Sequence, residues 1–267
     1  MEHAPLPVVR DILAMIIPGL IVLVVTLFTA ELGYRIGRKL KASTDEAMRS
    51  EINTIQAGTL SLLALLLGFS FSIGANAYEG RRLVITNEAA IIAKAYKSAE
   101  LLPEPAGSEI RGLLAQYTDT RLDLFYQGVL GEADVQDKLR ESERLQQAIW
   151  ARAKAAGNQA PRSVPVGLAL QAMNNLDELN PQRSMALTQT VPVAMMIALA
   201  VTAAVAMGWV GVGIGLGPRR NLAMSVILSV LFALIVAFII DLDQPRHGII
   251  RATQEPLLEL RESFKGS

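Results

Sequence analysis

Cysteine is absent from this chain of 267 residues, and histidine occurs only at His3 and His247. Without cysteine the protein forms no disulfide and no thiolate metal site. Two histidines in separate tails do not suggest a metal centre either. Basic and acidic residues number 25 each, so the formal net charge is zero and no overall field points to nucleic acid. We therefore expect no metal, no cofactor and no nucleic acid partner.

Charged residues are missing from four long stretches of the chain: Ile12–Ala30, Ala57–Tyr78, Ser184–Pro218 and Asn221–Ile240. Each is long enough to provide the roughly 20 residues that cross a hydrocarbon core of about 30 Å. A helix at the surface of a soluble protein faces water on one side and seldom lacks charge over such a length. We predict four transmembrane helices, at about residues 11–32, 57–78, 191–213 and 221–240. The third stretch exceeds one span, and we expect Pro192 near the first membrane turn.

The order of these stretches predicts an all-α integral membrane protein with four transmembrane helices in a 2+2 arrangement. Residues 1–78 hold the first pair, residues 184–240 hold the second, and a helical soluble domain at residues 79–183 is inserted between them. Apolar residues at three- and four-residue spacing, without strand alternation, predict helices in this middle domain. The first of these helices continues the second span without a break. Residues 241–267 form a polar tail.

The charges that flank the spans bear on orientation. The link after the first span carries Arg35, Arg38, Lys39, Lys41 and Arg49, and the link before the fourth carries Arg219 and Arg220. Positive charge in short links favours the cytoplasmic side, which would place the middle domain and both termini outside. Arg81 and Arg82 flank the membrane on the middle-domain side, so the orientation stays open.

The second span has one face of small and polar residues. Ser61, Leu65, Phe69, Ser72 and Asn76 fall on this face at helical spacing, together with Gly68. One interpretation is helix packing, because small residues let membrane helices approach closely. The other is a pore lining, in which Phe69 and Leu65 form an apolar constriction that gates by dewetting. The residues alone leave both interpretations open.

Acidic residues at the end of the fourth span need compensation. Asp241 and Asp243 lie at a helix C-terminus, where the helix dipole disfavours negative charge. In a four-span topology the ends of the second and fourth spans share one side of the membrane, so we expect pairs with Arg81 and Arg82. The alternative is a solvated pair of little energetic value. Near the end of the first span, we expect Glu31 to reach water or to pair with an arginine of a link.

Glycines recur near the end of the third span, at Gly208, Gly211, Gly213, Gly215 and Gly217. They resemble a phosphate-binding run, but no strand precedes them and no Gly-Lys-Ser or Gly-Lys-Thr follows. We interpret them as small residues that allow close helix packing.

Three segments resemble a known family: LLGFSFSIGANAYEGRR, NEAAIIAKAYKSAELLPEP and DLDQPRHGIIRATQEPLLEL. Together with GYRIGRK after the first span, they resemble the bacterial bestrophin-like family (the DUF4239 group) over nearly the whole chain. The more distant similarity is to bestrophin channels, which are pentamers with four spans per subunit and a cytoplasmic helical domain. In those channels a Leu-Gly-Phe step of the second span contributes its Phe to the narrow neck, and here this step is Leu67-Gly68-Phe69.

The resemblance also shows where this chain departs from the channels. The other neck positions fall at Leu65, which is apolar but not aromatic, and at Ser61, which breaks the pattern. The acidic cluster that holds calcium in the animal proteins is reduced to Asp241 and Asp243, too few oxygen ligands for a calcium site. The cytoplasmic domain that the resemblance implies opposes the orientation that the link charges favour.

These observations predict a multi-pass protein of the cell's inner membrane that acts as a homo-oligomeric ion channel or regulator of ion flux. Its expected partners are the lipid bilayer, further copies of itself (five by analogy) and small ions. The alternative is a non-conducting membrane sensor or scaffold whose helical domain binds a partner. We do not expect an enzyme, because the spans hold almost no ionisable residue and no nucleophile with its base is visible.

Overall fold

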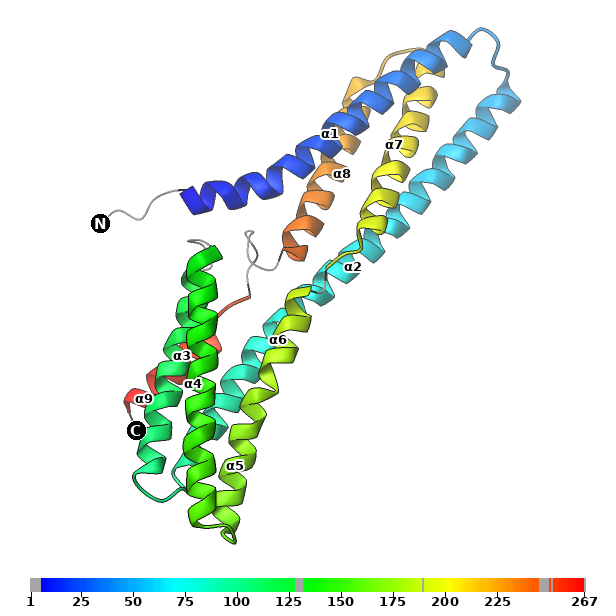
Figure 1. The fold of residues 1–267 in the computed structure, drawn as a ribbon. Coiled ribbons are helices and arrows are strands. Elements are labelled where there is room, and N and C mark those ends of the chain that lie inside the picture. The colour runs from blue at the N-terminus through cyan, green and yellow to red at the C-terminus, as the bar shows by residue number, and fades with distance from the viewer. Residues whose placement is uncertain (1–5, 128–131, 189, 245–249, 251, 267) are drawn as a thin grey trace. The chain divides into compact units, whose positions relative to one another are not determined.

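The computed structural model describes residues 6–127, 132–188, 190–244, 250 and 252–266 (Figure 1). Within these ranges the regular structure is helical throughout and contains no strand. The helices are α1 (Leu6–Leu40), α2 (Glu46–Ala99), α3 (Ala106–Gln127), α4 (Glu132–Gln159), α5 (Val164–Asp177), α6 (Leu179–Thr188), α7 (Val193–Leu216), α8 (Leu222–Asp243) and α9 (Glu255–Lys265). The predicted all-α fold is confirmed.

The chain divides into two compact units, and the boundary between them falls within α2. Unit 1 comprises residues up to Tyr78 and residues 190–251, and unit 2 comprises residues 79–189 and 252–267. Four helices, namely α1, α2, α7 and α8, are long and apolar enough to cross a membrane, which confirms the four predicted spans.

Unit 1 is built around apolar contacts of α2 and α1 with the α7–α8 pair. Leu63 and Leu67 of α2 are buried against Leu199 of α7 and Ile239 of α8. Near the opposite end of these helices, Ile52 of α2 packs with Val212 and Leu216 of α7. Elsewhere in the unit, Ala30 of α1 is buried with Met207 and Val210 of α7.

Glycine lets α1 and α7 approach at backbone distance. A Cβ added at Gly211 would lie closer than 3.0 Å to the backbone carbonyl of Ala30, and one added at Gly33 would meet the carbonyl of Gly208 in the same way. Gly215 of α7 is equally constrained by the backbone of Tyr34. At Gly211 and Gly215 the glycine run therefore serves close helix packing, as predicted.

The ends of the helices in unit 1 follow capping chemistry. Asp45 accepts a hydrogen bond from Met48 N at 2.8 Å, which fixes the start of α2 eleven residues before the charge-free stretch. Asn221 caps α8 by accepting from Met224 N at 3.4 Å. Pro192 is the N-cap of α7, at the predicted first membrane turn. Lys41 donates to Gly217 O at 2.8 Å, so the two short links contact each other.

Unit 2 is a helical bundle formed by the second part of α2, by α3 to α6 and by α9. Its core includes Ile92 of α2, Ile110 and Tyr117 of α3, Ile149 of α4 and Met173 of α5, all with 2% exposure or less. The C-terminal residues 241–267, which the sequence predicts as a polar tail, contain α9. Leu257 and Leu260 of this helix are buried in the same core, and Phe264 stacks on Tyr96 with ring centroids 4.1 Å apart.

Candidate functional site

The small and polar residues of the second span lie on an open face of α2. We call Ser61, Leu65, Gly68, Phe69, Ser72 and Asn76 the α2 face. All six are exposed in the single chain, and Leu65 and Phe69 are each 54% exposed despite their size. A Cβ added at Gly68 would meet no atom within 4 Å. Packing on this face would therefore require a second chain.

The opposite side of α2 holds the helix against the rest of unit 1. Leu63 is 1% exposed and Leu67 is 8% exposed, and both belong to the core with α7 and α8. Ser70 on this side is fully buried and donates to Leu66 O at 2.8 Å, which satisfies its hydroxyl within the helix. Since successive residues turn by about 100°, packing of this side directs the α2 face outwards.

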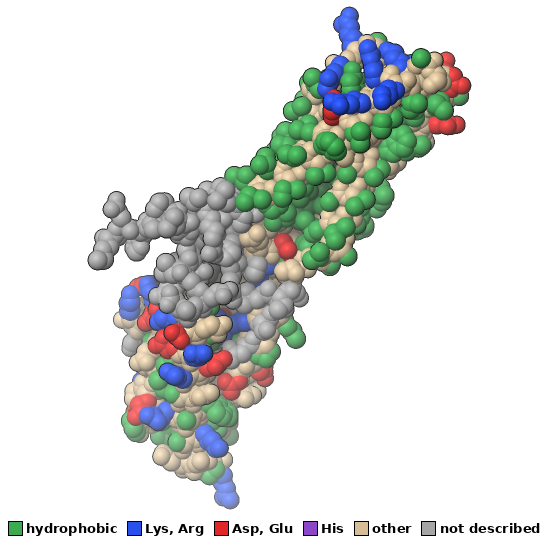
Figure 2. Space-filling view, turned by 45° about the horizontal axis from the view of Figure 1, so that its top comes forward, with side chains coloured by type: hydrophobic (Ala, Val, Ile, Leu, Met, Phe, Trp, Pro, Cys, Tyr) green, Lys and Arg blue, Asp and Glu red, His purple; other side chains and the backbone are tan. Residues whose placement is uncertain are grey.

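The other three spans expose a different kind of surface. Their exposed positions carry large apolar side chains, including Leu20, Val24 and Phe28 of α1, Ile197 and Val201 of α7, and Ile227, Leu231 and Leu234 of α8. Figure 2 shows such side chains over the visible side of unit 1. Side chains of this kind suit hydrocarbon, whereas polar groups in spans face a bundle interior or a water-filled cavity. By this criterion α2 differs from its neighbours, because it exposes Ser61, Ser72 and Asn76 beside large apolar side chains.

The acidic residues at the end of α8 accept backbone hydrogen bonds within unit 1. Asp241 is 2% exposed and accepts from Ile250 N at 3.0 Å. Asp243 accepts from Val191 N at 2.7 Å, which ties the end of α8 to the segment before α7. These bonds stabilise carboxylates at an unfavourable helix end.

The pairs of Asp241 and Asp243 with Arg81 and Arg82 stay a prediction. The two aspartates belong to unit 1, and the two arginines belong to unit 2. Arg81 is buried, with 7% exposure. Arg82 is exposed and forms an ion pair with Glu79 one turn earlier, at 3.6 Å.

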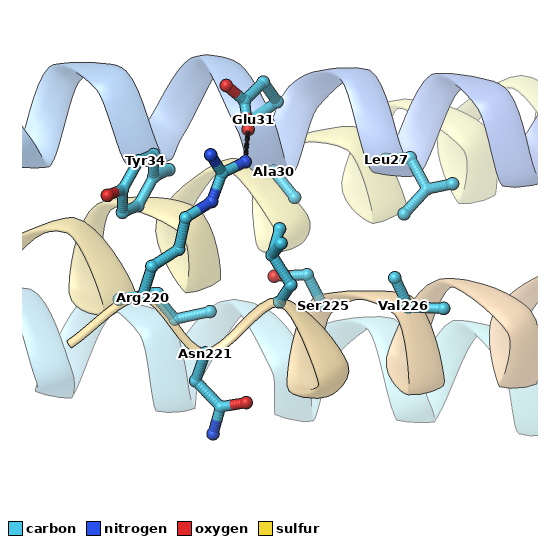
Figure 3. Close-up of a pocket in the computed structure, with 10 residues that line it drawn as sticks. Leu27, Ala30, Glu31, Tyr34, Arg220, Asn221, Ser225 and Val226 are labelled. Atoms are coloured by element: carbon cyan, nitrogen blue, oxygen red, sulfur yellow. Dashed lines mark hydrogen bonds and ion pairs between the residues drawn. The ribbon is translucent and has the colours of Figure 1, made fainter.

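Glu31 pairs with arginines, including one from the link before α8, as expected from the sequence. Arg220 Nη2 lies 2.5 Å from Glu31 Oε2, and Arg35 Nε lies 2.9 Å from Glu31 Oε1. The Arg220 guanidinium also covers the ring of Tyr34, at 4.6 Å from its centroid. Figure 3 shows this arginine reaching from the link towards α1. The contacts form one side of a pocket between α1 and α8.

A buried ionic network lies inside unit 2. The Glu88 carboxylate of α2 accepts from Arg121 Nε at 2.8 Å and from Arg183 Nε at 2.9 Å. Arg183 also donates to the Tyr117 hydroxyl at 2.9 Å, and Gln146 donates to the same oxygen at 3.3 Å. Burial acts to lower the pKa of Arg183, but Glu88 and Tyr117 outweigh it and the pKa is raised. The network joins α2, α3, α4 and α6.

Sequence reasoning missed this network, although a signal was present. Glu88 occupies the same helical face as Ile85, Ile92 and Ala95, so a carboxylate interrupts an apolar face. A charge at such a position needs a buried partner. The identity of its partners, from α3 and α6, depends on packing that no local pattern specifies.

Metal-binding clusters of His, Cys, Asp and Glu are absent from the part of the chain that the structure describes. His3 and His247 lie outside the described residues. Nothing in the described geometry assembles a nucleophile with a base. The features that remain are the α2 face, the boundary charges and the pocket at Arg220.

Comparison with known proteins identifies the fold. The chain is similar to solved structures of a bacterial bestrophin homologue from Klebsiella pneumoniae. One variant is 17% identical with a TM-score of 0.61, over 94% of this chain and 96% of that one. Another variant is 14% identical with a TM-score of 0.60, over 99% and 97%. A third structure is 16% identical with a TM-score of 0.59, over 94% and 95%.

Such similarity shows a bestrophin-like fold. A comparison with curated proteins gave no match. The family model described as Bestrophin-like domain matches residues 16–257, which is most of the chain. The narrower DUF4239 grouping stays a prediction. The chain belongs to the bestrophin-like family.

Proposed function

We propose that this protein is a homo-oligomeric ion channel, or a regulator of ion flux, in which the α2 faces of several copies surround a common axis. The observation that carries the proposal is the exposure of the whole α2 face. All six residues of the face are exposed in the single chain, and among them are the polar side chains of Ser61, Ser72 and Asn76. Membership of the bestrophin-like family supports the same function, since bestrophins are channels.

The chemistry of the α2 face fits a gated path. Ser61, Ser72 and Asn76 offer hydroxyl and amide groups that hydrogen-bond water. Leu65 and Phe69 lie between them and offer none, so rings of these side chains would expel water from a narrow axis and raise the barrier to ions. The face carries no charged side chain from residue 57 to residue 78, and we propose that hydration, not a ring of charge, controls passage.

The division into two units supports a protein with a membrane part and a helical soluble domain. Unit 1 (residues 1–78 and 190–251) would form the membrane part, which we predict from the helix pairs at residues 1–78 and 184–240. Unit 2 (residues 79–189 and 252–267) would form the helical domain that we predict at residues 79–183, with α9 of the C-terminal segment 241–267 packed into it. Five copies follow by analogy with bestrophin channels. The lipid bilayer and small ions are its proposed partners, and we propose no enzyme activity.

Ion flux into liposomes tests the proposal. Phe69→Ala removes the larger apolar side chain of the α2 face, and we expect flux on the order of tenfold higher, as for a barrier lower by about 1.4 kcal/mol. Phe71→Ala is the matched control. Phe71 is also exposed, at 43%, but it stacks on Phe238 with ring centroids 6.0 Å apart and lies off the α2 face. Its flux should equal that of the wild type.

Two results would contradict the channel. If wild type and both variants show no flux while the protein is oligomeric and folded, the sensor or scaffold alternative is preferred. If Phe71→Ala raises flux as much as Phe69→Ala, the increase reflects loosened packing and not a constriction at Phe69.

A further inference from the structure

The pocket between α1 and α8 has two chemically distinct parts. Its volume is about 230 Å³, and its apolar part is formed by Leu27 and Ala30 of α1, Ile214 of α7, and Leu222 and Val226 of α8. Its polar part is formed by Glu31, Tyr34, Arg220, Asn221 and Ser225. The polar residues lie at the end of unit 1 where the short links join the helices (Figure 3). A ligand that fills both parts must itself be amphipathic.

The apolar walls of the pocket are continuous with the surface that faces hydrocarbon. Leu222 is 54% exposed and Val226 is 44% exposed, and Phe28, next to Leu27 in the chain, is 67% exposed. In a four-span membrane protein these positions meet acyl chains. Lipid can therefore reach the pocket from the side without crossing the polar rim.

The polar part of the pocket is neutral by itself, with Arg220 and Glu31 as its charged residues, and its surroundings are positive. Arg35, outside the pocket lining, shares the carboxylate of Glu31 with Arg220, so the three side chains together carry one excess positive charge. A guanidinium has five N–H donors, and the ion pair with Glu31 occupies only part of them. Further cations of the links surround this end, namely Arg38, Lys39, Lys41 and Arg219. Figure 2 shows basic side chains gathered at one end of unit 1.

We propose that this pocket binds one phospholipid with an anionic headgroup. Its acyl chain lies along Leu27, Leu222 and Val226, and its phosphate receives hydrogen bonds from Arg220. Tyr34 and Glu31 orient the guanidinium, because the stacking and the ion pair fix its plane. A guanidinium with a fixed plane binds a phosphate group through charge-assisted hydrogen bonds better than mobile surface lysines do. A bound lipid would link α1 to the start of α8.

Native mass spectrometry of the full-length protein, stripped of endogenous lipid in detergent, tests the site. Phosphatidylglycerol is titrated, with phosphatidylcholine and inorganic phosphate as separate arms. Arg220→Gln should weaken the phosphatidylglycerol adduct by about tenfold, the loss expected for one hydrogen bond to a charged group. Arg219→Gln removes the same charge one residue earlier, outside the pocket lining, and should change binding by less than about twofold.

A second variant keeps every charge and fills the pocket with a large side chain. Ser225→Phe places a ring between α1 and α8 and should abolish the adduct, while the secondary structure stays unchanged by circular dichroism. If Arg220→Gln lowers the thermal stability, the Glu31→Gln/Arg220→Gln pair removes both charges together and should still show the loss.

Several outcomes would overturn the proposal. Equal losses in Arg219→Gln and Arg220→Gln would indicate diffuse surface charge. Equal affinity for phosphatidylcholine would exclude selection of an anionic headgroup. Inorganic phosphate that binds as tightly as the lipid would make this a free-anion site. Retention of the adduct in Ser225→Phe would place the lipid elsewhere. None of these results depends on ion flux, so this experiment tests the lipid site independently of the proposed channel function.

Discussion

At the scale of single residues, Glu88 is an acidic side chain buried in the core of unit 2. Its side chain is 3% exposed and lies between the guanidiniums of Arg121 and Arg183. Removal of one partner from a buried ionic network leaves charge without compensation, and this costs about 3–5 kcal/mol. We expect Glu88→Gln to lower the free energy of unfolding by an amount in this range.

Thermal unfolding followed by circular dichroism in detergent measures this loss. Glu79→Gln is the control, because Glu79 pairs with Arg82 at the surface, where such pairs contribute about 1 kcal/mol or less. A decrease of the same size in both variants would show that the Glu88 network is as weak as a surface pair. Far-UV spectra of the folded variants should not differ.

Glu31 and Glu88 are both acidic residues paired with arginines, and they differ in how far the sequence predicts their partners. Glu31 was expected to reach water or an arginine of a link because it lies at the end of an apolar stretch beside basic links, and the structure confirms the pair with Arg220. Glu88 lies within an amphipathic helix, and its partners come from α3 and α6, 33 and 95 residues away in the chain. Chain position limits the partners of Glu31, whereas only packing selects those of Glu88.

At the scale of elements, the contact of α1 with α7 depends on missing side chains. Gly211→Ala would place a methyl group against the backbone carbonyl of Ala30, an atom that cannot move without shifting α1. Overpacking of this kind costs about 1–3 kcal/mol. We expect a lower melting temperature and a weaker association of α1 with the rest of unit 1.

Gly58→Ala is the matched control, since a Cβ at Gly58 meets no atom within 4 Å. Alanine is a better helix former than glycine by about 0.5–1 kcal/mol, so this variant should be neutral or slightly more stable. A melting temperature for Gly211→Ala equal to that of Gly58→Ala would contradict close packing between α1 and α7.

Hydropathy predicts the helices that span the membrane, but it says less about helices that are stabilised by packing against other parts of the protein. The four spans can be predicted from the sequence because a stretch of about 20 uncharged, mostly apolar residues is typical of a transmembrane helix. The start of α2 at Glu46 depends on a cap at Asp45, which the charge-free stretch does not include. For α9, Leu257, Leu260 and Phe264 recur at helical spacing, but a helix of 11 residues is marginal in water without packing. Burial of Leu257 and Leu260 in the core of unit 2 stabilises it.

At the scale of the whole molecule, the open face of α2 requires a second chain if it is to surround an axis. A single copy buries Leu63 and Leu67 and leaves Ser72 and Asn76 exposed, so the proposed association of copies would cover the polar side of this span. The number of copies depends on the angle between neighbouring subunits, which no pattern within one chain encodes. Periodicity could predict the face, but it could not predict how many faces meet.

The absence of cysteine allows a direct test of that association. Ser72→Cys introduces one thiol per chain on the α2 face, and oxidation in liposomes should join neighbouring copies through this residue. Leu234→Cys, at a position of α8 that is 62% exposed and apolar, should remain monomeric on denaturing gels because lipid surrounds it. If the α2 face instead meets lipid, Ser72→Cys will not cross-link more than Leu234→Cys. Native mass of the wild type then gives the number of 28.8 kDa chains around the axis, five if the analogy with bestrophin channels holds.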